Sequence, residues 1–272
     1  MSHAARRANN RMVETPAAGR WMLAALAALL AIAAQTAAAR ADQREDFLAG
    51  RTRACPRCDL AGANFKRRDL AGVDLSGANL KDANLHDARL TGARLADADL
   101  SNANLNKANL SRADLSGANL RDAMLYAANL DGAKLVGADL TEALMGAARM
   151  TRSDLTKAIL REVDLRKSRV AEAIMVGADL TGAAFDFAFM RGARLDGASL
   201  REARLIGAEL IDASLVGADL TEADALGANL RGADLSRATL ARTSFRKANM
   251  YETKLDDAVF RDTVMPDGTT QP

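Results

Sequence analysis

Residues 118–140 read ANLRD AMLYA ANLDG AKLVG ADL, which is one five-residue phrase repeated without an insertion. The phrase continues in both directions, because every residue number divisible by five from Leu60 to Met265 holds its central residue, which gives 42 repeats. Thirty of these central residues are Leu, and 33 of the positions two residues earlier are Ala. A short, fixed period over most of a chain predicts a solenoid.

A period of five fits neither a helix nor a straight strand, although Ala and Leu favour helix. Five residues advance a helix by about 500°, so the Leu side chains would spiral around its axis. In a strand each repeat would turn its Leu to the other face, since five is odd. We therefore expect the chain to bend once per repeat. Fifteen of the 19 glycines stand two residues after the central residue, where a type II turn needs a positive φ.

This phrase resembles the repeats of pentapeptide-repeat proteins, over 210 of the 272 residues. The resemblance implies an all-β fold, a right-handed quadrilateral β-helix with four repeats per coil and about 10.5 coils. Arg68 stands where Ala belongs. We expect its repeat to be distorted or to lie at the edge of a cap, because a buried guanidinium without partners is costly.

The chain before the repeats divides into two segments. Residues 1–41 have a basic start, a 14-residue apolar run from Trp21 to Ala34 and small residues after it, the order of a secretory signal peptide. The alternative is a membrane anchor through residues 21–39, but the apolar run is shorter than the roughly 20 residues that span a bilayer. We therefore expect a periplasmic or secreted protein. Its parts would be a cap with a short helix at 42–57, the repeats at 58–267 and a polar tail at 268–272.

Removing residues 1–41 changes the formal net charge from +2 to −2, because 32 Lys and Arg and 34 Asp and Glu remain. The basic character of the whole chain thus belongs to the expected export signal. We expect the remaining chain to bind no nucleic acid and, after signal cleavage, no membrane.

Cys55 and Cys58 are the only cysteines. In an exported chain their expected state is a disulfide, and the repeat frame points both side chains inward. Pentapeptide-repeat proteins often begin with a similar Cys-x-x-Cys entry, so the resemblance also implies a bracket at the cap. The alternative is a thiol redox pair, which normally opens a helix. Because His3 and His86 are the only histidines, we expect no metal and no other cofactor.

The repeats offer no catalytic arrangement, since the solenoid contains one histidine and its Asp and Glu residues recur with the repeat. We expect a non-enzymatic scaffold or rod that binds an unknown protein partner. Residues 20 apart should lie on one face, and we number the faces one to four by their first central residues: Leu60, Phe65, Leu70 and Leu75. On the second face Met124, Tyr126 and Leu144 should be exposed neighbours, and we predict a partner surface there.

Some pentapeptide-repeat proteins inhibit DNA gyrase by imitating duplex DNA, so a DNA-mimic regulator of a type II topoisomerase is the alternative function. The first face is the most acidic, with a net charge of −6. DNA carries roughly 30 charges over the roughly 50 Å expected for this coil, so the face is too sparse in charge. The end of the repeats is the candidate contact for an end-to-end homodimer, through Met250, Leu255, Phe260 and Met265.

Overall fold

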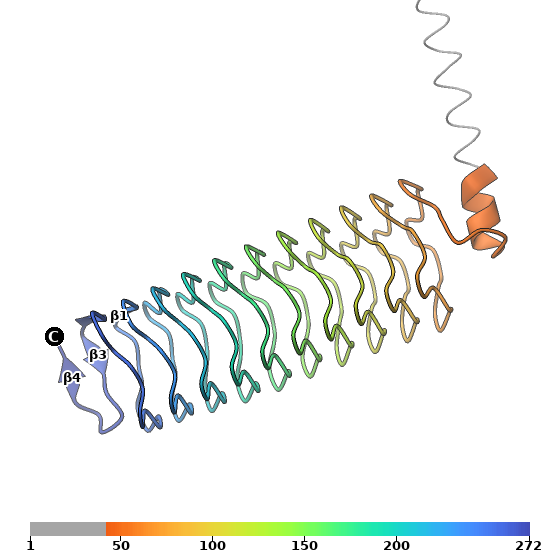
Figure 1. Cartoon of the computed structure of the whole chain (residues 1–272). Helices are drawn as coiled ribbons and strands as arrows, with labels where there is room; N and C mark the ends of the chain where they lie inside the picture. The colour runs from red at the N-terminus through yellow and green to blue at the C-terminus, as the bar shows by residue number, and fades with distance from the viewer. Residues whose placement is uncertain (1–41) are drawn as a thin grey trace, which may run out of the picture. The chain divides into compact units, whose positions relative to one another are not determined.

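The computed structural model describes residues 42–272, so the expected signal peptide at 1–41 and the alternative anchor at 21–39 lie outside the described residues. A short helix at residues 42–48 leads into a coil that winds to the C-terminus (Figure 1). Strands of more than one residue occur at the C-terminal end of the described chain: β1 (Thr239–Ala241), β2 (Val259–Arg261), β3 (Thr263–Val264) and β4 (Thr270–Gln271).

Parallel bridges between residues 20 apart hold the coil together. Asp59 bridges Asn79, Asn79 bridges Asp99, and the same register follows on the other faces and between β1 and β2. At each rung the N–H of the central residue donates to a carbonyl of the next coil, as from Leu60 to Asn79 at 2.7 Å. Twenty residues are four repeats, so the coil has the four repeats per turn that the resemblance implied. Most bridges involve a single residue because the chain turns a corner every five residues.

Each corner is a turn closed by a backbone hydrogen bond, such as that from the Ala63 N–H to the Leu60 carbonyl at 3.0 Å. The second corner residue has a positive φ throughout the repeats, 64° at Gly62 and 55° at Ala127. Glycine adopts this conformation without steric cost, whereas a residue with a Cβ is strained. The N–H of this second corner residue donates to the next coil, as from Gly62 to the Lys81 carbonyl at 2.8 Å. The stacking of coils therefore imposes the turn even where glycine is absent.

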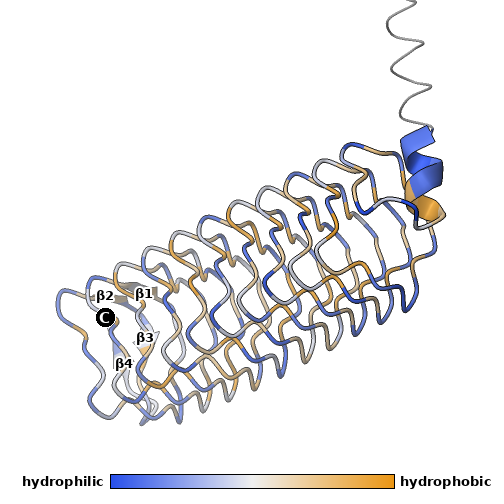
Figure 2. Ribbon diagram, turned by 45° about the vertical axis from the view of Figure 1, so that its right-hand side comes forward, coloured by the Kyte–Doolittle hydropathy of each residue, from blue (hydrophilic) through white to orange (hydrophobic). Residues whose placement is uncertain are grey.

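The core is the axis of the coil, filled by the central residues and the Ala positions. Figure 2 shows hydrophobic residues recurring in each coil, with hydrophilic ones between them. Leu80, Met145 and Phe185 are fully buried, so Met and Phe act as core residues at central positions. Thr243 and Thr263 replace Ala near the end of the coil. Their hydroxyls donate to carbonyls of the preceding coil, at 2.7 and 2.6 Å, so these buried groups are satisfied.

Arg68 fastens the helix at residues 42–48 to the first coils. Its guanidinium donates to the carbonyls of Phe47 and Leu48 at the end of the helix, at 3.1 and 2.8 Å. It also lies near the rings of Phe47 and Phe65, which meet edge to face with centroids 5.9 Å apart. The turn of its own repeat is regular, with the Arg68 N–H bonded to the Phe65 carbonyl at 3.0 Å. Of the two expectations for this repeat, the cap contact is correct and the distortion is wrong, because the guanidinium finds partners on the helix.

Within the polar tail expected at 268–272 lies β4, which pairs antiparallel with β3. The chain reverses at Gly268, whose φ is 88°. The preceding residue, Asp267, supports this reversal, because its carboxylate accepts the backbone N–H and the hydroxyl of Thr269 at 2.9 and 2.7 Å. The central residues of the last coil remain only half-buried: Met250, Leu255, Phe260 and Met265.

Charged side chains alternate between successive coils on two faces. On the fourth face the ladder reads, in order, Asp74, Arg94, Asp114, Lys134 and Asp154. On the first face aspartate occupies every second rung, at Asp59, Asp99, Asp139, Asp179 and Asp219, with an uncharged residue between each pair. Neighbouring rungs lie about 4.8 Å apart, so alternation keeps like charges from facing each other. From Asp59 to Asp219 on the first face and from Asp74 to Asp154 on the fourth, the charge pattern therefore repeats every two coils, while the backbone repeats every coil.

Candidate interaction surface

Among residues 42–272 no group of three His, Cys, Asp or Glu side chains is placed to hold a metal ion. In the same part of the chain no helix has the length and apolarity needed to cross a bilayer.

On the second face the structure brings Met124, Tyr126 and Leu144 together. Met124 and Leu144 are bridged on consecutive rungs. The Tyr126 ring lies over the next corner, where a Cβ added to Gly146 would be 3.5 Å from the ring. Tyr126 is 56 % exposed and Leu144 is 51 % exposed. A large aromatic side chain therefore lies against the corner at Gly146, beside an exposed Leu.

This surface replaces a backbone-capping pattern. At other rungs of the second face an asparagine side chain accepts the N–H two residues on, as Asn84 does from His86 at 3.2 Å. Met124 cannot do this, and the Tyr126 N–H donates instead to Oδ1 of Asn106, one coil earlier, at 2.8 Å. Asn106 thus replaces the acceptor that is missing at Met124, and the sequence analysis did not identify it. The signal that could have identified Asn106 is its position 20 residues before Tyr126.

A shallow hollow of about 320 Å³ adjoins the Tyr126 ring. It is lined by Tyr126, Gly146, Ala147, Asp164, Arg166 and Lys167. Nε and Nη2 of Arg166 donate to the Asp164 carboxylate at 2.8 and 2.7 Å. The Arg166 side chain is the main cause that lowers the pKa of Asp164, so the carboxylate is charged at neutral pH. The hollow thus has an aromatic wall, a floor of small residues and a charged wall.

The acidic residues of the first face are neutralised in part by arginines on adjacent coils. The ion pairs are Arg121–Asp139, Arg161–Asp179 and Arg201–Asp219, at 3.3, 2.5 and 3.0 Å. Burial alone raises the pKa of Asp179, but the Thr181 hydroxyl, the Arg161 side chain and the Thr181 N–H lower it below its ordinary value. These carboxylates are therefore engaged within the coil rather than displayed as a free acidic row.

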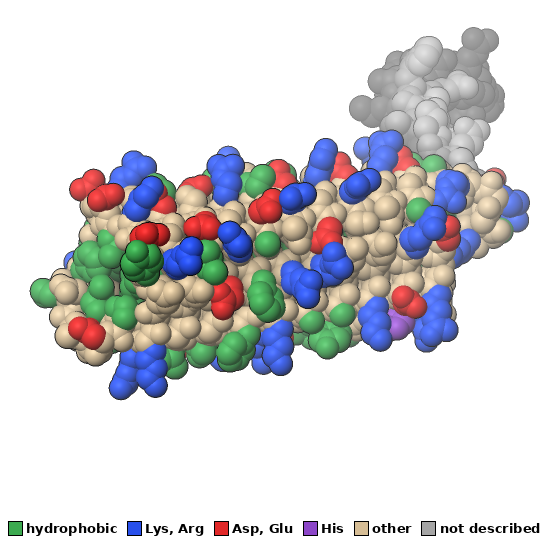
Figure 3. All heavy atoms as spheres, turned by 60° about the horizontal axis from the view of Figure 1, so that its bottom comes forward, with side chains coloured by type: hydrophobic (Ala, Val, Ile, Leu, Met, Phe, Trp, Pro, Cys, Tyr) green, Lys and Arg blue, Asp and Glu red, His purple; other side chains and the backbone are tan. Residues whose placement is uncertain are grey.

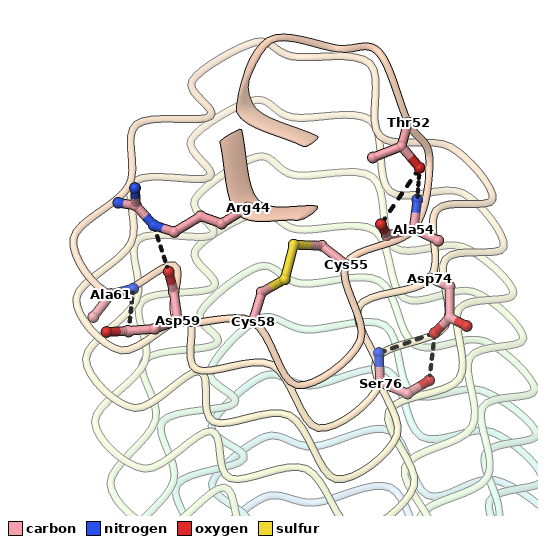
Figure 4. Close-up of a disulfide and its surroundings, with 9 residues drawn as sticks. All are labelled: Arg44, Thr52, Ala54, Cys55, Cys58, Asp59, Ala61, Asp74 and Ser76. Atoms are coloured by element: carbon pink, nitrogen blue, oxygen red, sulfur yellow. Dashed lines mark hydrogen bonds between the residues drawn. A yellow bond between two sulfur atoms is a disulfide. The ribbon is translucent and has the colours of Figure 1, made fainter. Parts of the chain in front are cut away.

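Cys55 and Cys58 lie inside the first coil, with exposed fractions of 0 and 2 %. Their Sγ atoms are joined and their Cα atoms are 5.4 Å apart (Figure 4). Next to them, Arg44 Nε donates to the Asp59 carbonyl at 2.7 Å. Buried sulfur atoms beneath a cap are not placed for exchange with another thiol.

Comparison with known proteins identifies the family. The family model described as pentapeptide repeats matches eight times within residues 58–262. This chain belongs to the pentapeptide-repeat family. Among solved structures it is similar to HetL, a pentapeptide-repeat protein involved in heterocyst differentiation regulation from the cyanobacterium Nostoc sp. strain PCC 7120. The identity is 31 %, the match covers 84 % of this chain and 97 % of HetL, and the TM-score is 0.57.

Two other pentapeptide-repeat structures cover less of this chain than HetL does and have lower TM-scores. The Nostoc protein alr5209 is 41 % identical over 36 % of this chain and 78 % of its own, with a TM-score of 0.32. Full-length QnrB1, a plasmid-mediated fluoroquinolone resistance protein, is 20 % identical over 75 % of this chain and 94 % of its own, with a TM-score of 0.44. No curated protein matches the sequence. The family model and the similarity to HetL confirm the pentapeptide-repeat β-helix.

Proposed function

We propose that this pentapeptide-repeat protein is an exported, non-enzymatic scaffold that binds a protein partner through Met124, Tyr126 and Leu144. The observation that carries the proposal is the Tyr126 ring, held over Gly146 beside exposed Leu144. A large aromatic residue presented on a rigid backbone is the kind of residue that contributes most to protein interfaces. The hollow beside it can accept one side chain of the partner.

Site-specific photo-crosslinking tests this surface. A benzophenone side chain at position 126 should yield a defined crosslinked species in the cell envelope of the source organism. The species should be lost when Leu144→Asp is added, because a charge at this exposed position disrupts the contact without entering the core. The matched control is a benzophenone at Val136, which is exposed on the fourth face. Equal crosslinking from both positions would refute the assignment of the surface.

Export and the disulfide form one part of the proposal. The sequence of residues 1–41 supports a periplasmic or secreted protein, and membrane anchoring through residues 21–39 is the alternative. The intact mass of the protein from its native envelope separates the two: cleavage gives a chain starting near Asp42. A mass two daltons lower before reduction than after it would demonstrate the Cys55–Cys58 disulfide.

The two alternative functions have less support. A DNA mimic of a topoisomerase substrate needs a dense negative surface, whereas Arg121, Arg161 and Arg201 pair with the aspartates of the first face. A supercoiling assay with DNA gyrase should therefore show no inhibition. A thiol redox role needs an accessible cysteine, whereas Cys55 and Cys58 are buried. Cys55→Ser should lower the stability of the protein, and neither the wild type nor this variant should show thiol reductase activity.

The proposal also includes the handedness of the coil, its number of turns and a contact between two copies of the chain. The coil would be the right-handed quadrilateral β-helix of the family, and its 42 repeats would form about 10.5 turns. The half-buried central residues of the last coil favour an end-to-end homodimer, although β4 pairs beside them. Sedimentation of the wild type and of Phe260→Glu tests this contact, because the charge should leave only monomer.

A further inference from the structure

The ladder of the third face changes character in the middle of the coil. Between Asp69 and Arg89 at its start and Asn249 at its end, its rungs are Asn109, Asn129, Arg149, Arg169, Phe189, Glu209 and Asn229. Asparagine at this position can accept the backbone N–H two residues on, as Asn129 does from Asp131 at 3.0 Å. Arginine and phenylalanine cannot, and Arg149 and Arg169 place two positive charges on adjacent rungs, which is unfavourable. Arg149 gains an ion pair with Asp131, whereas Arg169 gains none within residues 42–272.

Two shallow hollows lie beside these rungs. The first, about 290 Å³, is lined by Arg112, Asp131, Gly132, Arg149, Thr151 and Arg152. Arg112, Gly132 and Arg152 are successive second corner residues, so the missing side chain of Gly132 leaves a gap between two arginines. The second, about 310 Å³, is lined by Thr151, Arg169, Ala171 and Phe189. Thr151 lines both hollows, so they adjoin, and the two together are here named the arginine groove.

The charges of the arginine groove are only partly balanced. Arg149 pairs with Asp131 and Arg152 pairs with Glu172, both at 2.7 Å. Arg112 and Arg169 form no ion pair within residues 42–272. Two cationic groups are thus available to a ligand, one in each hollow.

The two hollows differ in chemistry. The first has three guanidinium groups around a gap without a side chain, which suits a carboxylate. The second has the small Ala171 and the Phe189 ring, which is 52 % exposed, and it suits an apolar side chain. Gly132 and Ala171 lie two coils apart, about 10 Å at the spacing of stacked strands. An extended peptide covers that distance in about three residues.

We propose that the arginine groove binds an acidic, extended peptide segment of a partner protein. A carboxylate of the segment lies in the gap at Gly132, and an apolar side chain about three residues away packs on Phe189. Nucleic acid fits the groove less well, because Asp131 and Glu172 stand among the arginines and would repel a row of phosphates. On the face seen in Figure 3, basic, acidic and hydrophobic side chains occur in small groups along the coil. The site is independent of the surface around Tyr126.

Fluorescence anisotropy with the full-length protein tests the proposal. The probe is a labelled peptide, Ser-Glu-Glu-Ser-Gly-Phe-Ser, and the controls replace both Glu by Gln or move Phe next to Glu. We expect the probe to bind with a dissociation constant below about 1 mM, and each control to bind at least about fivefold more weakly. The affinity should fall as salt is raised, since the carboxylate contact is screened.

Variants of the protein locate the site. Arg112→Ala with Arg169→Ala should weaken binding of the probe at least about tenfold. Phe189→Ala should do so for the probe but not for the control peptide in which Phe stands next to Glu. Arg231→Ala, an exposed arginine further along the third face, and Leu144→Asp on the second face should bind as the wild type does. Because the side chains changed are exposed or form no ion pair within the described chain, all variants should melt as the wild type does.

The proposal is overturned by any of three results. These are a probe that does not bind at about 1 mM, a probe that binds the Arg112→Ala/Arg169→Ala protein equally well, and a 12-nucleotide single strand that binds the groove more tightly than the peptide. Because Leu144→Asp leaves the groove intact, failure of the surface around Tyr126 and failure of this site are distinguishable.

Discussion

Nη2 of Arg68 lies 2.8 Å from the carbonyl oxygen of Leu48, so a residue of the repeats closes the end of the helix that precedes them. A helix end leaves carbonyl groups without partners, and a cation satisfies them well. One departure from the Ala pattern therefore couples the cap to the coil.

Replacing Arg68 tests this coupling. Arg68→Ala removes two hydrogen bonds from a charged donor and should destabilise the cap by about 2–3 kcal/mol. Hydrogen exchange measured by mass spectrometry should then accelerate in residues 44–65 and stay unchanged in residues 150–220. The matched control is Arg67→Ala, since Arg67 is an exposed neighbour with one long ion pair to Asp87. Equal exchange in the two variants would contradict the role of Arg68.

Replacing either of two adjacent alanines at a corner by Gly should change the stability of the protein in opposite directions. Ala127 has a φ of 55°, whereas Ala128 is fully buried in the axis. Ala127→Gly should stabilise the protein by about 0.5–1 kcal/mol, because it relieves a left-handed conformation at a smaller entropic cost. Ala128→Gly should destabilise it by about 1 kcal/mol, because it removes core packing and adds chain entropy. Urea unfolding measures both changes, and the same sign for both would contradict the corner geometry.

Acid should lower the stability of the folded protein by protonating the Asp179 carboxylate on the first face. The pKa of this carboxyl is lowered in the folded chain, so its charge stabilises the fold above the pKa of the unfolded chain, near 3.8. That stabilisation is lost as the pH falls from about 5 towards the folded pKa. Asp179→Asn should therefore be less stable than the wild type at pH 7, by about 1 kcal/mol, and the difference should shrink as the pH falls below about 4. Thermal melts across this range check the convergence, and a constant difference would contradict it.

Lys134 tests the alternation of charge on the fourth face, where it stands between Asp114 and Asp154. Lys134→Asp places three aspartates on successive rungs and should cost about 1 kcal/mol more than Lys134→Gln. The additional cost should shrink in about 0.5 M salt, because exposed charges are screened. Urea unfolding at low and high salt measures it. A penalty that salt does not change would mean that packing, not charge, decides this position.

The sequence by itself determined the backbone of the coil. A period of five with Leu and Ala at fixed places admits one way of burying every Leu, which is a bend in each repeat, and the glycines mark the corners. The buried positions of Cys55 and Cys58 followed from the same frame. Local rules suffice here because every coil contacts only its neighbours.

The tertiary structure decided what the repeat does not encode locally. The partners of Arg68, the acceptor Asn106 beneath Tyr126 and the pairing of β4 with β3 depend on residues up to 21 positions away in the chain. The groove between Arg112 and Arg152 exists because Gly132 lies between them in the stack. Side chains on neighbouring coils meet only when the coil closes, so stacking, and not the five-residue phrase, determines the surfaces available for binding.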